Sequence, residues 1–215
     1  MMKAIQINTI LFLGLIILGC NQNNAIVPDL TQVSDPEIWT VHNRVVSVGE
    51  EVHLDANQSD GFVKLNDLVF ADGTIELDIK GKNDPGKSFV GLAFHGLNDS
   101  TYDVVYFRPF NFQNPERNTH SVQYIAHPEY TWRILRESHP DKYENKIDPV
   151  PDPDSWFHVK LVIKDHLLEA YVNNSETPSL SINQVSHRHK GWVGFWVGFN
   201  SEGWFKNLEI TPAEL

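Results

Sequence analysis

Side chains able to bind sugar hydroxyls gather in one stretch of this sequence, Phe89 to Glu137. Arginine, glutamine and histidine offer hydrogen-bonding groups in directions that suit hydroxyls and carboxylates. Large aromatic rings provide an apolar face on which the C–H side of a sugar ring can stack. Six candidates lie in the stretch and one lies far downstream: His95, Tyr106, Arg108, Gln123, Trp132, Arg136 and Trp196.

Three runs of alternating residues must position most of these candidates: Phe89–His95, Tyr102–Phe110 and Ser121–Ala126. Successive side chains of a strand point to opposite faces of its sheet, so apolar residues at every second position predict a buried face. That alternation predicts Val90 and Phe107 in the core, and His95, Tyr106, Arg108, Gln123 and, from a later strand, Trp196 on the outward face. A register error of one residue would exchange every face.

Similar short runs, separated by turn residues, fill the remainder of the chain, so we predict an all-β protein made of two antiparallel sheets. Only Thr131–Glu137 favours a helical turn, and Ser138–Pro153 predicts a long surface loop. The other predicted strands are Val45–Val48, Glu51–Leu54, Phe62–Leu65, Gly73–Gly81, Trp156–Asp165, Leu167–Asn173, Ser179–Ile182, Gly191–Gly198 and Gly203–Ile210.

Length and charge narrow the class of protein further. The 215 residues, 41% of them hydrophobic, are enough for one domain with a sizeable core. The formal net charge of −11 and the absence of basic runs argue against a nucleic-acid partner, whose phosphates need clustered lysine and arginine.

The first residues have the pattern of an export signal. Lys3 precedes an apolar run, Ile10 to Leu18, that is too short to be a comfortable membrane span. The run ends Ile17-Leu18-Gly19-Cys20, which resembles the lipobox of bacterial lipoproteins. The resemblance implies a signal peptide at 1–19, lipidation of Cys20 and a lipid-anchored exported protein of the bacterial cell envelope. The polar residues that follow, without periodicity, predict a tether at 20–38, and the strand pattern that begins at Trp39 predicts a domain at 39–215. An ordinary signal peptide or short anchor helix, with Cys20 incidental, is the alternative.

Four passages of the domain resemble the concanavalin A-like lectin/glucanase superfamily. They are Ala71–Ile79, Phe89–His95, Tyr106–Asn111 and the pair Val193–Val197 with Phe205–Ile210. The resemblance is nearest to the 3-keto-disaccharide hydrolase-like domains of exported bacterial proteins. It implies a two-sheet jelly-roll sandwich whose concave sheet holds a sugar, and therefore a glycan or oligosaccharide as partner.

The resemblance leaves open whether the domain only binds carbohydrate or also cleaves it. Glycoside hydrolases of family 16 share this fold and place two glutamates on one strand face. In this sequence Glu76-Leu77-Asp78-Ile79 is followed by Lys80, so the acid/base position is basic. No catalytic residue is assigned. A hydrolase of the 3-keto-disaccharide type, acting through His95, Arg108 and Gln123, stays as one alternative, and a structural or adhesion domain as another.

Metal ligands are sparse in the sequence. The pair His187 and His189 lacks a nearby partner and indicates a solvated loop. Asp72, Asp99 and Asp103 are the only candidates for a calcium site of the kind found in many jelly rolls. We predict no cofactor, with calcium as the one alternative.

Overall fold

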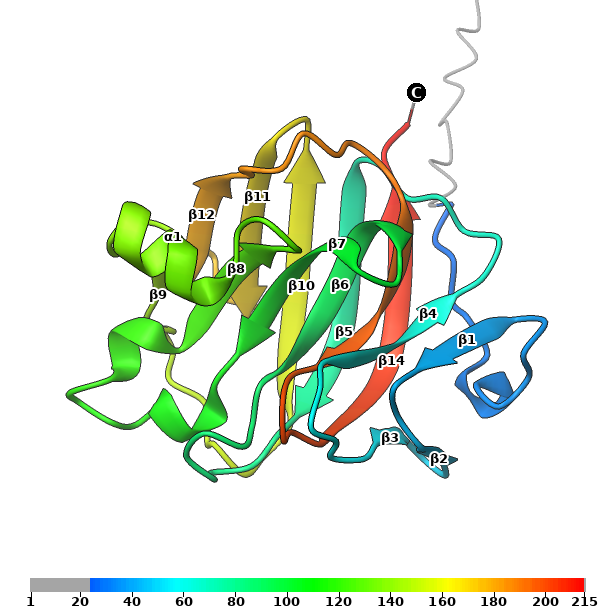
Figure 1. Cartoon of the computed structure of the whole chain (residues 1–215), viewed down its shortest axis with the longest axis horizontal. Coiled ribbons are helices and arrows are strands. Elements are labelled where there is room, and N and C mark those ends of the chain that lie inside the picture. The colour runs from blue at the N-terminus through cyan, green and yellow to red at the C-terminus, as the bar shows by residue number, and fades with distance from the viewer. Residues whose placement is uncertain (1–23, 215) are drawn as a thin grey trace, which may run out of the picture.

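Two antiparallel sheets packed face to face form the protein in the computed structural model, which describes residues 24–214 (Figure 1). The front sheet has the order β1 (Trp39–His42), β4 (Gly61–Leu65), β13 (Trp192–Val197), β6 (Val90–Asn98), β7 (Thr101–Phe107), β8 (Val122–Ala126) and β9 (Glu144–Asn145). The back sheet has the order β12 (Leu180–Asn183), β11 (Leu167–Val172), β10 (Phe157–Lys164), β5 (Gly73–Lys80), β14 (Gly203–Pro212), β3 (Val52–Leu54) and β2 (Val46–Val48).

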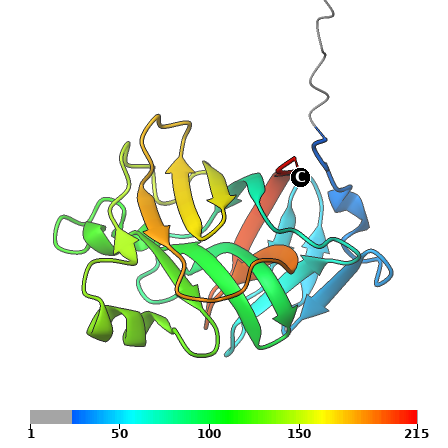
Figure 2. The ribbon, with the colours of Figure 1, turned by 90° about the horizontal axis from the view of Figure 1, so that it is seen from above.

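Helical segments are few and short. Helix α1 (Trp132–Ser138) and the 3-10 turns η2 (Pro109–Asn111) and η3 (Asn118–His120) follow strands of the front sheet, and η1 (Leu30–Gln32) precedes β1. Figure 2 shows α1 on the side of the front sheet that faces away from the back sheet. None of the helices described is long and apolar enough to cross a membrane.

The core lies between the sheets and comes from the alternation seen in the sequence. Ile75, Leu77 and Ile79 of β5 are fully buried, whereas their neighbours along the strand are half-buried. From the front sheet, Phe195 stacks on Phe205 of the back sheet with ring centroids 4.8 Å apart. Every predicted strand is present with its ends shifted by a few residues, so the prediction of an all-β two-sheet sandwich is confirmed.

The predicted surface loop Ser138–Pro153 is the main correction to the secondary structure. It contains β9, and Tyr143, Glu144 and Ile147 within it are buried. A strand of two residues is too short to show an alternating pattern, so the sequence carries no periodic signal for it. Strand β1 was likewise not predicted.

A bulge in β6 changes the position predicted for His95. The pairing of β6 with β7 shifts register between Phe94 and Asn98, and His95 has a φ of 49°. A bulge interrupts the strict alternation of faces. His95 is fully buried, and its Nε2 lies 2.8 Å from the backbone oxygen of Ala71. The prediction that His95 faces outward into a binding groove is therefore wrong.

The segment predicted as a tether lies partly against the sandwich. Ile26 forms an antiparallel bridge with Ile210 at β14, and Val33 is fully buried. The predicted signal peptide, 1–19, and the predicted lipidation site, Cys20, lie outside the described residues.

A buried ion pair holds the crossover from the back sheet to the front sheet. Asp103 of β7 is fully buried and accepts hydrogen bonds from Tyr124 Oη at 2.9 Å and Ser186 Oγ at 2.6 Å. Arg188 donates to the other carboxylate oxygen, with its Nε 3.0 Å away. Burial and the charge of Asp103 raise the pKa of Tyr124, so its hydroxyl is a dependable donor. Ser186 and Arg188 both belong to the segment between β12 and β13.

We expect Arg188→Met to lower the free energy of unfolding by about 3–5 kcal/mol, because it leaves the buried Asp103 charge without its cation. The measurement is urea denaturation followed by tryptophan fluorescence. Arg133→Met is the matched control: Arg133 is exposed, and it forms no ion pair within residues 24–214, so a change below about 0.5 kcal/mol is expected. A loss below about 1 kcal/mol in Arg188→Met would contradict the role given to the pair.

Candidate functional site

A single row of side chains crosses the outer face of the front sheet. Residues directly opposite each other on neighbouring strands share a face, so the strand register identifies the row. In order from β1 to β9 it contains His42, Phe62, Trp196, Gly91, Tyr106, Gln123 and Glu144. The prediction that Tyr106, Gln123 and Trp196 share the outward face is confirmed by this register.

Glycine at the centre of the row lets two aromatic rings meet. Gly91 pairs with Trp196 on one side and with Tyr106 on the other, and these two rings lie 5.3 Å apart between centroids. A Cβ atom at Gly91 would come within 2.6 Å of Tyr106 Cα. The strand position therefore has no room for a side chain, and the aromatic pair forms the floor of the site.

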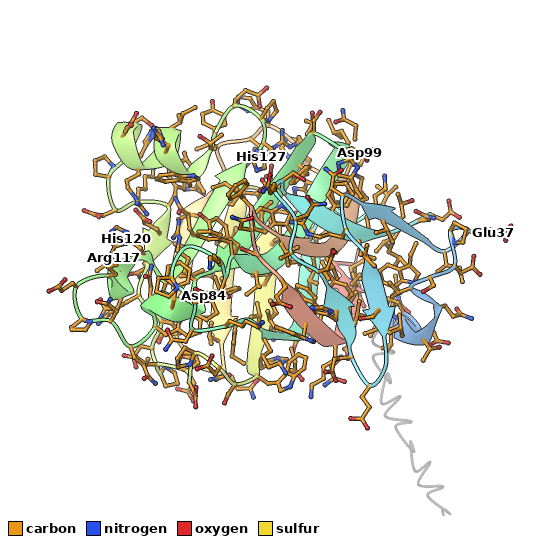
Figure 3. All side chains as sticks on the ribbon, turned by 60° about the horizontal axis from the view of Figure 1, so that its bottom comes forward. Glu37, Asp84, Asp99, Arg117, His120 and His127 are labelled. Atoms are coloured by element: carbon orange, nitrogen blue, oxygen red, sulfur yellow. The ribbon has the colours of Figure 1, made fainter. Side chains whose placement is uncertain are left out.

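An open cleft of about 910 Å³ lies over this floor. Tyr106 and Trp196 line its base, and its walls come from α1, the 109–120 segment and two loops. Residues of the 127–131 connection and Asp60 complete the lining. In Figure 3, Arg117 and His120 of the 109–120 segment project from the same side of the molecule, apart from His127. The cleft is thus assembled from segments that are distant in sequence.

Aromatic rings make up much of the lining, and their exposure differs. Tyr106 and Trp196 are nearly buried, whereas 42% of Trp132 and 52% of Phe199 is exposed. Trp132 begins α1, and the guanidinium carbons of Arg133 and Arg136 each lie 5.3 Å from its ring centroid. The exposed face of Trp132 therefore stands at the rim, where a ligand ring has access to it.

Arg108, Tyr106 and Gln123 form a connected hydrogen-bond network under the cleft. Arg108 Nη2 donates to Tyr106 Oη at 2.5 Å and also to Gln123 Oε1, and Tyr106 Oη donates to the same amide oxygen at 2.9 Å. Arg108 Nη1 donates to the carbonyl of His120 at 2.9 Å. Burial lowers the pKa of Arg108, while Tyr106 and Glu144 oppose that shift. Burial raises the pKa of Tyr106, so it remains a neutral donor.

Glu144 joins this network to the wall of the cleft. Both of its oxygens accept from Arg136, at 2.8 Å from Nε and 2.5 Å from Nη2. Its Oε2 also lies 2.9 Å from His120 Nδ1 and 3.7 Å from Arg108 Nη1. Burial by itself would raise the pKa of Glu144, but the hydrogen bonds and charge of Arg136, with His120 and Arg108, leave that pKa lowered. One buried carboxylate therefore orients two arginines of the site.

The structure brings together six of the seven residues predicted for the site. Five line the cleft: Tyr106, Arg108, Trp132, Arg136 and Trp196. Gln123 lies beneath it and bonds to Tyr106 and Arg108, and its Nε2 lies 3.5 Å from the Trp132 carbonyl oxygen. His95 is the exception, because the β6 bulge buries it against Ala71.

Several residues of the site were missed by the sequence analysis. Arg117 and His120 line the cleft, and Glu144 supports it from below. Arg117 and His120 lie in an irregular polar segment that contains Asn114 and Pro115. Such a segment carries no period from which a face can be assigned. The arginine-rich composition of Arg108–Arg136 was the one available signal.

The calcium alternative has no cluster of ligands in the described part of the chain. Within residues 24–214, no three His, Cys, Asp or Glu side chains gather closely enough to hold a metal ion. Asp103 is occupied by Arg188, and Asp99 lies 3.6 Å from Lys64 Nζ.

Comparison of the structure with solved proteins identifies the class of fold. The carbohydrate-binding module CBM66 from Bacillus subtilis matches with a TM-score of 0.61 and 16% identity over 80% of this chain and 95% of that chain. The exoplasmic/lumenal domain of VIP36, in a metal-free form, matches with a TM-score of 0.62 and 12% identity, covering 83% of this chain and 86% of that one.

A third solved structure is described as a candidate glycosyl hydrolase, from Parabacteroides distasonis ATCC 8503. It matches with a TM-score of 0.55 and 13% identity over 87% of this chain and 94% of that chain. The fold is therefore the concanavalin A-like sandwich that the sequence resembles. No protein-family model and no curated protein sequence matches the chain.

We expect Glu144→Gln to destabilise the protein by about 1–3 kcal/mol at pH 7, because a buried charge-assisted pair is lost. A carboxyl whose pKa is lowered on folding stabilises the folded state above its unfolded pKa, and this contribution is lost as the pH falls through the folded pKa. The difference between wild type and Glu144→Gln should therefore shrink as the pH falls below the ordinary glutamate value of 4.5.

Urea denaturation of both proteins at pH 7 and near pH 3 measures this difference. Glu137→Gln, an exposed position on the same helix as Arg136, is the control and should change the free energy of unfolding by less than about 0.5 kcal/mol. A difference that stays constant or grows on acidification would contradict the lowered pKa of Glu144.

Proposed function

We propose that this protein binds carbohydrate in the cleft over the front sheet, which we take to be the concave face of the jelly roll. The observation that carries the proposal is the cleft itself. It combines two adjacent aromatic rings on the floor, Tyr106 and Trp196, with an exposed tryptophan at the rim and fixed guanidinium donors. Sugar recognition needs apolar ring faces beside oriented donors, and pockets of this size suit small ligands.

The structural neighbours support the same class of ligand. One of them is a carbohydrate-binding module, and VIP36 was also solved with Man3GlcNAc bound. Because one fold can serve many functions, the main support for carbohydrate binding is the cleft and not the likeness of the fold. The network of Arg108, Tyr106 and Gln123 supports binding, since it holds the Tyr106 ring and the Arg108 guanidinium in place before a ligand arrives.

Hydrolysis of a glycoside is the second candidate, favoured by the candidate glycosyl hydrolase among the neighbours. The carboxylates argue for binding instead. Among residues 24–214, Asp60 is the one carboxylate that lines the cleft, and Glu144 below it is held by Arg136 and buried. Hydrolysis by a pair of carboxylates needs two of them flanking the scissile bond. Release of glucose or keto-glucose from 3-keto-glucosides that is abolished by Arg108→Ala would overturn the choice of binding over hydrolysis.

A purely structural role would be favoured if the protein covered the cleft with its own chain. The loop 149–154 does not contribute to the lining, and Asp154 accepts a hydrogen bond from the backbone of Asn83 instead. The cleft is open over its aromatic floor, which favours a ligand over an adhesive surface.

We expect Trp132→Ala to weaken glycan binding at least tenfold while leaving the fold intact, because the ring is half-exposed at the rim and stacks on the ligand. The full chain, purified in detergent, is applied to a glycan array, and the affinity for each hit is measured by calorimetry. Trp156→Ala is the matched control, since Trp156 packs beside Lys80 and Lys206 and does not line the cleft. Equal losses in both variants, or no binding to any glycan, would sink the proposal.

We further propose that the protein is an exported lipoprotein anchored in the cell envelope through Cys20. The support is the sequence Ile17-Leu18-Gly19-Cys20 after the apolar run. Stable anchoring needs more than one acyl chain, which a lipidated amino-terminal cysteine provides.

Cys20→Ser should move the protein from the membrane fraction to the soluble fraction of expressing bacteria. Metabolic labelling with a radioactive fatty acid should label the wild type and leave Cys20→Ser unlabelled. Ser34→Ala, a substitution in the same amino-terminal region, serves as the control and should leave both results unchanged. Membrane association that survives Cys20→Ser would point to the alternative of an anchor helix.

A further inference from the structure

The charge of the cleft is opposite to the charge of the protein. The sequence holds six arginines and has a formal net charge of −11. Four of those arginines line the cleft, whereas none of the lysines in the described residues does so. The lining arginines are Arg108, Arg117, Arg133 and Arg136. Arginine carries a planar fork that matches carboxylate and sulfate groups, and lysine does not.

Two of the four arginines lie beside one carboxylate of the protein, Glu144, which they share. Glu144 is paired with Arg136 through both of its oxygens and lies 3.7 Å from Arg108. The one carboxylate in the lining, Asp60, lies 3.3 Å from His127. These pairs account for every carboxylate in or directly beneath the cleft that the described chain supplies.

The other two arginines have no such partner. Within residues 24–214, neither Arg117 nor Arg133 has a carboxylate at ion-pair distance, and both side chains are exposed. They come from different elements, Arg117 from the turn between η2 and η3 and Arg133 from α1. Both nevertheless line the same cleft. An acidic protein thus places two unpaired guanidinium groups at the edge of its binding cleft.

The position of Arg133 beside Trp132 indicates how a charge on the ligand would be used. The Arg133 guanidinium carbon lies 5.3 Å from the Trp132 ring centroid, so a donor fork and a stacking face are adjacent. A sugar ring on the exposed face of Trp132 would bring an acidic substituent of that ring within reach of the rim arginines. A neutral sugar would leave both charges unused.

We propose that the cleft binds an acidic glycan, with a carboxylate or sulfate group of the sugar contacting Arg117 and Arg133. This inference rests on the proposed carbohydrate-binding function and names the class of ligand. Charge attraction at this exposed rim is screened by salt, so the preference for acidic over neutral glycans should fall as the ionic strength rises.

Two matched pairs of polymers test the inference and separate its two sources of charge. Polygalacturonate is compared with its methyl ester, which removes the carboxylate charge, and dextran sulfate is compared with dextran. Affinities are measured with the full chain in detergent at 50 and 300 mM salt. We expect at least one acidic member to bind at least tenfold more tightly than its neutral partner at low salt. The pair that shows the difference identifies the group recognised.

The variant R117Q/R133Q should lose that preference, so that it binds the acidic and the neutral member of each pair equally. The control K164Q/K190Q changes the net charge equally, at exposed positions outside the cleft, and should retain the preference. Polyglutamate tests for attraction to any polyanion and should bind at least tenfold more weakly than the acidic glycan. Equal binding of polyglutamate, or the same loss in the control, would overturn the inference.

Different experimental results would overturn the preference for acidic glycans and the proposed carbohydrate binding itself. If neutral and acidic members bind equally and Trp132→Ala abolishes both, carbohydrate binding stands and the preference for acidic glycans is overturned. If no member of either pair binds and the glycan array is also blank, both are overturned.

Discussion

The arrangement of the cleft depends on one buried carboxylate. Glu144 is 4% exposed and lies among Arg136, His120 and Arg108, which come from three different segments. Burying a carboxylate costs free energy unless cations and hydrogen bonds surround it. The three segments are therefore stabilised in the positions that keep their cationic side chains beside Glu144. Three elements, α1, the turn η3 and the end of β7, are therefore joined by ionic contacts to the same carboxylate of the edge strand β9.

The front sheet is unusual in that both of its faces are covered along most of its strands. β7, β8 and β13 are buried at nearly every position, although antiparallel sheets commonly leave one face to water. On the inner face the cover is the back sheet. On the outer face the cover is α1 (Figure 2), together with the neighbouring aromatic rings and the loops that line the cleft. The floor is thus partly desolvated, which strengthens the polar contacts made there.

Acidic and basic side chains are distributed unevenly over the protein. Acidic side chains dominate the protein as a whole, while the arginines concentrate at the cleft. The Asp103–Arg188 pair serves the fold instead, since it ties the crossover segment to β7 inside the sandwich. Arg188 therefore stabilises the fold through a carboxylate of the core. Arg117 and Arg133, by contrast, line the cleft and have no carboxylate at ion-pair distance within residues 24–214.

The sequence by itself determined the two-sheet sandwich, every strand except β1 and β9, and the shared outward face of Tyr106, Gln123 and Trp196. The reason is that the period-two alternation of side chains can be read from neighbouring residues alone. Only the tertiary structure decided the rest. The bulge at His95 breaks that alternation without a signal in residue type, and β9 is too short to have a period. Glu144 meets Arg108 and Arg136, and Arg117 joins Arg133, through contacts between segments that no local pattern relates. Desolvation and charge pairing act through space, so the composition of the cleft follows from the packing of the chain and not from its order.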